Sequence, residues 1–108
     1  MCHLLEQYPQ MDAVFVANDQ MALGVLHCLH QKGIRVPDDL AVVGFDGLPE
    51  SACFWPPLTT VYQDQRKVGC TAVSELVSLI DAPEQNVNEF RYVVFEPELV
   101  IRASSGSV

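Results

Sequence analysis

Four side chains in this sequence offer the oxygen and nitrogen atoms that could bind a hydroxylated small molecule: Asn18, Asp19, Asp46 and Gln63. A carboxylate accepts hydrogen bonds from hydroxyl groups, and an amide both donates and accepts them. The set therefore suits a neutral, polyhydroxylated ligand such as a sugar or a nucleoside. An alternative remains open, because Asn18 and Asp46 are also residue types that only cap helices or turns.

No catalytic motif accompanies these side chains. The sequence contains no G-x-S-x-G elbow, no P-loop and no G-x-G-x-x-G turn. Its three histidines are not paired with a Cys or Ser in a recognisable arrangement. We therefore expect that the protein is not an enzyme and has no catalytic residues, no cofactor and no metal site.

The four polar residues lie at the ends of apolar runs that predict strands. Residues 13–17 and 40–45 are continuously apolar, which is typical of parallel strands covered on both faces, and residues 58–62 predict a third strand. The carboxyl ends of such strands meet at one edge of the sheet, where ligands bind in open α/β folds. We therefore predict an α/β fold in which a parallel sheet flanked by helices presents the polar residues at one edge.

Two helical patterns follow these strands. The first begins after Asn18 and Asp19 and ends at Gly33, which suits a left-handed C-terminal position. The second covers 64–80 and carries an apolar stripe close to the 3.6-residue period. Residues 1–10 have the pattern of the last turns of a further helix.

The rest of the chain predicts extended and irregular segments. Two extended pieces, RYVVF at 91–95 and ELVIR at 98–102, bring the strand candidates to five. A polar loop is expected at 84–89 and a frayed polar tail at 104–108. The loop at 47–57 holds Phe54 and Trp55, which form either a packing plug or part of a subunit contact.

Composition limits the classes of partner. The chain has 108 residues, about one domain, and a net charge of −8 with six scattered basic residues, so we do not expect it to bind nucleic acid by itself. No apolar run approaches the roughly 20 residues of a membrane span, and the first ten residues lack a signal-peptide pattern. We expect no membrane partner and no export.

The four cysteines, at positions 2, 28, 53 and 70, form no C-x-x-C pair. Disulfides in a secreted chain and a zinc site are the alternatives to reduced cysteines in a cytoplasmic protein. Low cysteine density and the lack of an export signal favour reduced, mostly buried cysteines.

Four motifs that follow one another along the chain resemble sequences of the LacI/GalR family of bacterial transcription regulators. Their residues are most similar to the lactose-repressor branch. The motifs are VANDQMALG at 16–24, RVPDDLAVVGFD at 35–46, PPLTTVYQD at 56–64 and EPELVIR at 96–102. The resemblance covers about residues 11–105. It implies a type I periplasmic-binding-protein-like fold.

The resemblance also implies how the chain fits into a regulator of this family. Such a regulator has an N-terminal helix-turn-helix headpiece, a hinge and a two-lobed sugar-binding core. Residues 1–108 would be a C-terminal fragment of that core, mostly its C-terminal lobe, with about 64–95 packing in the N-terminal lobe. Operator DNA would be bound only through the headpiece, which this sequence lacks.

Residue roles follow from the same resemblance. Asn18 and Asp46 match positions that hydrogen-bond the hydroxyl groups of the effector, and Gln63 matches a position that lines the same cleft. Leu23 and the Cys53-Phe54-Trp55 loop match the dimer interface. Two residues after Gln63, Gln65 stands where the lactose-repressor branch has an aromatic residue, so the resemblance leaves the identity of the ligand open.

The function implied is that of the effector-binding and dimerisation part of a cytoplasmic, sugar-responsive repressor, with sugar binding between the lobes controlling operator binding. The partners implied are a sugar or related polyhydroxylated effector and a second copy of the chain, in a homodimer or a higher homo-oligomer. A periplasmic sugar-binding protein of a transport system is the alternative with the same fold. An α/β enzyme is a more distant one.

Overall fold

The computed structural model describes residues 1–82 and 92–106. The predicted polar loop at 84–89, Arg91 of the RYVVF segment and the last two residues of the predicted tail lie outside the described residues. Contacts divide the chain into two units, one made of Met1–Tyr62 with Glu98–Val108 and the other of Gln63–Pro97.

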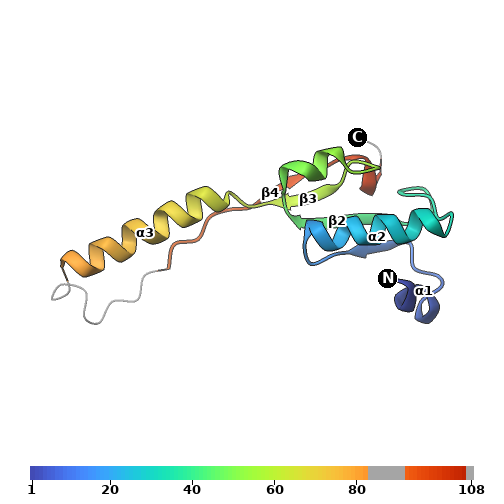
Figure 1. Ribbon diagram of the computed structural model, residues 1–108, viewed down its shortest axis with the longest axis horizontal. Coiled ribbons are helices and arrows are strands. Elements are labelled where there is room, and N and C mark those ends of the chain that lie inside the picture. Colours follow the sequence, from blue (N-terminus) through green and yellow to red (C-terminus); the bar gives the residue numbers. More distant parts are fainter. Residues whose placement is uncertain (83–91, 107–108) are drawn as a thin grey trace. The chain divides into compact units, whose positions relative to one another are not determined.

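The first unit is built on a four-stranded mixed sheet (Figure 1). Its strands lie in the order β1 (Ala13–Phe15), β2 (Ala41–Asp46), β3 (Thr59–Tyr62) and β4 (Glu98–Val100). The first three run parallel, with Val43 opposite Thr59 in β2 and β3, whereas β4 runs antiparallel to β3. The predicted α/β fold class is confirmed, with the antiparallel β4 making the sheet mixed.

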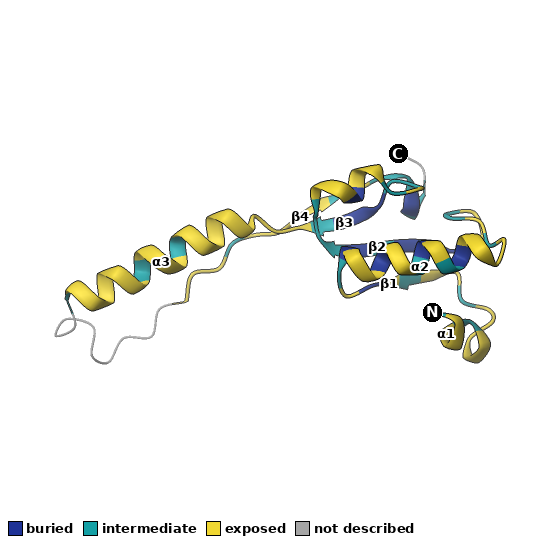
Figure 2. Ribbon diagram, viewed as in Figure 1, coloured by how far each residue is buried: buried dark blue, intermediate teal, exposed yellow. Residues whose placement is uncertain are grey.

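Helix α2 (Asp19–Gln31) packs one side against this sheet. Figure 2 shows its buried residues along one side of the helix, and these are Asp19, Ala22, Leu26 and Leu29. The helix ends as predicted, because Gly33 has a φ of 71° and the backbone N–H of Ile34 donates to the carbonyl of Leu29 at 2.9 Å.

The core of this unit is a small apolar cluster. Burial of each leucine in it contributes about 1.5–3 kcal/mol. The members of the cluster come from α2 and from residues in or beside the strands: Val16, Ala22, Leu26, Leu29, Leu40, Val42 and Leu58.

The segment predicted as a frayed tail is partly an ordered element of the core. Residues Ala103–Ser105 form a 3-10 turn, η3, and Ser104 is fully buried. The Ser104 hydroxyl accepts from the backbone N–H of Thr59 at 2.8 Å and donates to the carbonyl of Val42 at 2.6 Å. The prediction was wrong because these small polar residues satisfy backbone groups inside the sheet.

Two short elements lie at the periphery of the first unit. Helix α1 (Cys2–Gln7) contains no buried residue, although Met1 and Leu5 pack partly against the core. The 3-10 turn η1 (Pro49–Cys53) lies inside the predicted 47–57 loop and buries Ser51. The prediction of mostly buried cysteines is wrong, since Cys28 is half-buried and the other three are exposed.

The second unit contains α3 (Gln65–Asp81), which begins at the N-cap residue Asp64. The helix was predicted almost to the residue, yet it buries no side chain (Figure 2). Tyr92 to Phe95 form no strand, so the prediction of five strands is wrong by one. A strand needs a partner for its backbone groups, and no pairing of these residues occurs in the described part of the chain.

Within residues 1–82 and 92–106, no helix combines the length and the apolar character that crossing a membrane would require.

Gly44 in β2 is a position at which the fold cannot accept a side chain. A Cβ there would overlap Asp19 Oδ1 and come within 2.8 Å of Leu58 Cδ2, whereas a Cβ on Gly24 of α2 would meet nothing within 4 Å. We expect Gly44→Ala to lower the free energy of unfolding by about 1–3 kcal/mol. Gly24→Ala, the matched control, should raise it by up to about 1 kcal/mol through helix propensity. Urea denaturation followed by circular dichroism measures both, and equal effects would contradict the packing described here.

Candidate functional site

The N-terminus of α2 lies over the carboxyl ends of β2 and β3, held there by Asp19. The side chain of Asp19 is fully buried. Its Oδ1 accepts from the hydroxyl of Thr60 at 2.6 Å, and its Oδ2 accepts from the backbone N–H of Leu48 at 2.8 Å. One carboxylate thus connects the helix, strand β3 and the loop after β2.

The local sequence explains why a carboxylate can occupy this place. Asp19 is in the first turn of α2, where the helix dipole favours a negative group. Gly44 leaves the space beside Oδ1, since any side chain there would overlap it. Both carboxylate oxygens are bonded inside the protein, so the expectation that Asp19 contacts a ligand does not fit its burial. Its two hydrogen bonds join the α2 terminus to β3 and to the loop after β2.

Asn18 is placed by the same helix terminus. It is the N-cap of α2, and its Oδ1 accepts from the backbone N–H of Met21 at 2.8 Å. The capping alternative is therefore correct for its oxygen. The side chain remains half-exposed, and its amide nitrogen makes no hydrogen bond within residues 1–82 and 92–106. Capping orients the amide and leaves its nitrogen without a partner in that part of the chain.

Asp46 is the last residue of β2 and has an unusual backbone. Its φ of 112° lies in a region that residues with a side chain rarely adopt, and it is alone in this among the described non-glycine residues. Such strain costs about 1–3 kcal/mol and is typical of functional sites. The carboxylate is half-exposed and makes no hydrogen bond in the described part of the chain.

The residue after Asp46 shows why the chain turns so sharply here. Gly47 has a φ of 77°, and a Cβ on it would lie 2.6–2.9 Å from atoms of Tyr62, the residue opposite Asp46 in β3. The β2 exit is therefore pressed against the end of β3. This close approach fixes the backbone of Asp46 at the same edge of the sheet as the α2 N-terminus.

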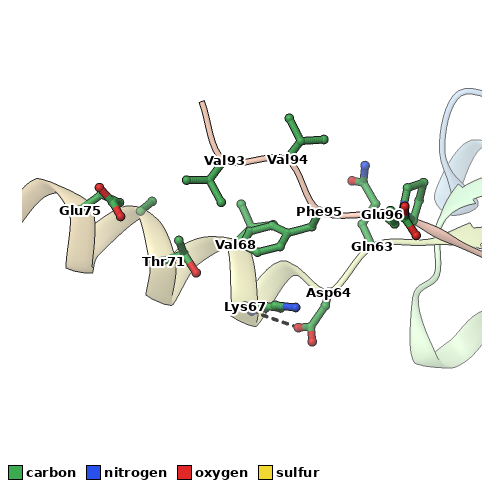
Figure 3. A pocket seen from close by; sticks show the side chains of 12 residues that line it. Gln63, Asp64, Lys67, Val68, Thr71, Glu75, Val93, Val94, Phe95 and Glu96 are labelled. Carbon is green, nitrogen blue, oxygen red and sulfur yellow. Dashed lines mark hydrogen bonds between the residues drawn. The ribbon is translucent and has the colours of Figure 1, made fainter. Parts of the chain in front are cut away.

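Gln63 directly follows β3 in the chain and belongs to the second unit. It lines an open groove of about 710 Å³ that lies between α3 and the segment up to Pro97 (Figure 3). The groove includes neither Asn18 nor Asp46. The prediction that Gln63 shares a ligand with these two residues concerns both units and stays a prediction.

The groove of the second unit has a mixed lining (Figure 3). The Lys67 ammonium lies 4.7 Å from the centre of the Phe95 ring, a cation–π contact, and the backbone N–H of Lys67 donates to Asp64 Oδ1 at 3.0 Å. Much of the remaining lining is apolar, and the full set is Gln63, Asp64, Lys67, Val68, Thr71, Ala72, Glu75, Val93, Val94, Phe95, Glu96 and Pro97.

The sequence did not predict a cluster of polar contacts around the start of β3. The guanidinium of Arg102 donates to the Ser51 hydroxyl at 2.8 Å and to the carbonyl of Leu58 at 2.9 Å. The Thr59 hydroxyl accepts from the backbone N–H of Arg102 at 2.7 Å. The available signal was the pair Thr59-Thr60 inside an apolar run, because buried hydroxyl groups need partners.

The residues expected at a dimer interface differ in exposure. Trp55 is 86% exposed and Leu23 is 49% exposed, whereas Phe54 packs partly against the core. Cys53 is exposed at the end of η1. Trp55 also lines a surface pocket together with Leu26 of α2, one helical turn from Leu23.

Comparison with known proteins identifies the fold family. Residues 2–105 match the family described as a periplasmic binding protein-like domain. The chain belongs to this family. The HTH-type transcriptional repressor PurR of Haemophilus influenzae (strain PittEE) is 38% identical over 108 residues, which are 100% of this chain and 32% of that protein. The chain therefore spans about a third of the length of the curated relatives it matches.

Two solved structures extend this comparison. The transcriptional regulator CelR in complex with cellobiose is 36% identical, with a TM-score of 0.88, over 96% of this chain and 31% of that chain. The lac repressor dimer bound to operator and the anti-inducer ONPF is 37% identical, with a TM-score of 0.83, over 97% of this chain and 35% of that chain. The resemblance to LacI-family regulators is thereby confirmed.

Replacement of the strained residue at the β2 exit should stabilise this LacI-family chain. Asp46→Gly relieves the positive φ, and we expect it to raise the free energy of unfolding by about 1 kcal/mol despite the added chain entropy. Asp38→Gly, at an exposed turn position without a positive φ, should be neutral or destabilising. Urea denaturation compares the two variants, and a destabilised Asp46→Gly protein would contradict the strain.

Proposed function

We propose that the chain is the effector-binding and dimerisation part of a LacI-type transcriptional repressor. The observation that carries the proposal is the polar edge of the sheet, where Asn18 and Asp46 are both fixed in place and both keep polar atoms without internal partners. An amide donor and a carboxylate acceptor suit the hydroxyl groups of a sugar. The CelR neighbour, a complex with cellobiose, supports this class of effector.

The proposed mechanism is a shift between two arrangements of the regulator. Effector bound between the two lobes favours one arrangement, which changes the geometry of the dimer and thereby the position of the DNA-binding headpieces. Operator DNA is contacted by the headpiece and not by this acidic chain. The lac repressor neighbour, a dimer bound to operator, supports this assignment.

We assign the chain no catalytic role and a cytoplasmic location, as part of the same proposal. The relatives reported above are transcriptional regulators. This favours a repressor over the periplasmic transport protein and the α/β enzyme, the two alternatives considered for the sequence.

The second unit is assigned to the N-terminal lobe of the intact regulator. In helix α3, the relative solvent exposure is 62% for Val73, 57% for Leu76 and 66% for Ile80. Apolar helix stripes of this kind are normally covered. We propose that residues of about 64–95 pack against the remainder of the regulator, and that Gln63 is the third residue to contact the effector.

The effector contacts can be tested with a substitution that keeps the helix cap. Serine caps helices about as well as asparagine, so Asn18→Ser in the intact regulator should keep its stability and lose only the amide donor. The effector is first identified by thermal-shift screening of cellobiose, lactose and related sugars. We then expect the Kd of the Asn18→Ser variant for this effector to rise roughly 5- to 150-fold, equivalent to about 1–3 kcal/mol.

The matched control for this test is Gln31→Ser at the opposite, exposed end of α2. Isothermal titration calorimetry should show the affinity of this control unchanged. An unchanged affinity for Asn18→Ser as well would remove Asn18 from the proposed site.

The proposed dimer interface calls for a separate test. We expect Trp55→Asp and Leu23→Asp to shift the intact regulator from dimer to monomer. Each substitution would place an unpaired carboxylate in a contact from which water is excluded. Tyr8→Asp is the control, because Tyr8 is 61% exposed and outside the proposed interface. Analytical ultracentrifugation distinguishes the species. A dimer that survives both substitutions would overturn the interface assignment.

A further inference from the structure

Two thiols from different helices meet at the surface of the first unit. Cys2 Sγ in α1 lies 3.0 Å from Cys28 Sγ in α2, although the residues are 26 positions apart in the chain. A disulfide bond is about 2.05 Å long, so closing this pair requires the sulfur atoms to approach by about 1 Å. No other pair of cysteine sulfurs is within hydrogen-bonding distance in residues 1–82 and 92–106.

We propose that Cys2 and Cys28 are an oxidative modification site, which forms a reversible intrachain disulfide with a small-molecule disulfide such as oxidised glutathione. Neither thiol has a part in effector binding as proposed above. The inference therefore stands independently of the repressor function.

The two thiols differ in a way that suits this chemistry. The hydrogen bond with Cys28 lowers the pKa of Cys2, and the charge of Lys32 acts in the same direction. The same contact raises the pKa of Cys28, and partial burial adds to the increase. Cys2 is also the more exposed of the pair. Cys2 is therefore the attacking thiolate and Cys28 the resolving thiol.

The reaction proceeds in two exchange steps. The Cys2 thiolate attacks one sulfur of oxidised glutathione, which forms a mixed disulfide and releases one glutathione thiolate. Cys28 then loses its proton to solvent and attacks the Cys2 sulfur, which forms the intrachain bond and releases the second glutathione thiolate. The two released thiolates take up the two thiol protons, so the protein dithiol is oxidised and one oxidised glutathione is reduced to two molecules of glutathione.

The bond would change the docking of α1. This helix buries none of its residues and is attached to the core through Met1 and Leu5, which are only partly buried. A covalent link from Cys2 to α2 restrains the open states of α1 without requiring a new packing surface. Backbone amides of α1 should therefore exchange more slowly with deuterium in the oxidised chain than in the reduced one.

The test uses the full chain with Cys53→Ser and Cys70→Ser as a background, since both of these residues are exposed and neither belongs to the pair. The protein is incubated with oxidised glutathione, quenched with a thiol-alkylating reagent and mapped by mass spectrometry. We expect a Cys2–Cys28 cross-linked peptide, reversed by dithiothreitol, together with slower deuterium exchange in α1. Full alkylation of both cysteines after oxidation would overturn the proposal.

Single substitutions test the assigned order of attack. In Cys28→Ser the mixed disulfide should persist on Cys2, because the resolving thiol is absent. In Cys2→Ser the remaining Cys28 should react with glutathione disulfide about tenfold more slowly than Cys2 does in the Cys28→Ser variant. Equal rates, or faster reaction of Cys28, would overturn the assignment of Cys2 as the attacking thiolate.

Discussion

The buried carboxylate of Asp19 is the contact on which the arrangement of the candidate site depends. It accepts from the Thr60 hydroxyl on β3 and from the Leu48 backbone N–H after β2, and it lies in the first turn of α2. A buried carboxylate without partners would be very costly, so helix, strand and loop must stay together. The small apolar core alone would not fix the helix terminus relative to the strand ends so closely.

The placement of Asn18 and Asp46, the two residues proposed to contact the effector, follows from this contact. With the α2 terminus fixed, Asn18 uses its oxygen to cap the helix, and its amide nitrogen makes no hydrogen bond in the described part of the chain. The loop after β2 is held at Leu48, and Gly47 lies against Tyr62, so Asp46 is kept in a backbone conformation that it would otherwise leave. Rigid placement of a few polar groups is what a binding site needs, because less ordering then accompanies ligand binding.

The sequence predicted the positions of β1 and β2 well because both are continuously apolar, as at 40–45, although the expected cover on both faces is not seen: Phe15 of β1 is 65% exposed and only alternate residues of β2 are buried. It predicted the edge of the sheet at which Asn18, Asp19 and Asp46 lie. It did not predict that Asp19 would be buried and its neighbour Asn18 partly exposed. The phase of the helix decides this, since Asn18 lies outside the first turn and Asp19 inside it. The role of Ser104 depends on backbone groups of distant residues, which no local pattern reports. The 92–95 segment has strand composition, but composition does not supply a partner.

A double-mutant cycle between Asp19 and Thr60 tests the central contact most directly. Asp19→Ala, Thr60→Val and the combined variant are unfolded in urea beside the unmodified chain, and the coupling energy is calculated from the four free energies of unfolding. Each single change leaves the other group buried without its partner, so we predict a coupling energy of about 1–3 kcal/mol. Effects that add within about 0.3 kcal/mol would contradict the account.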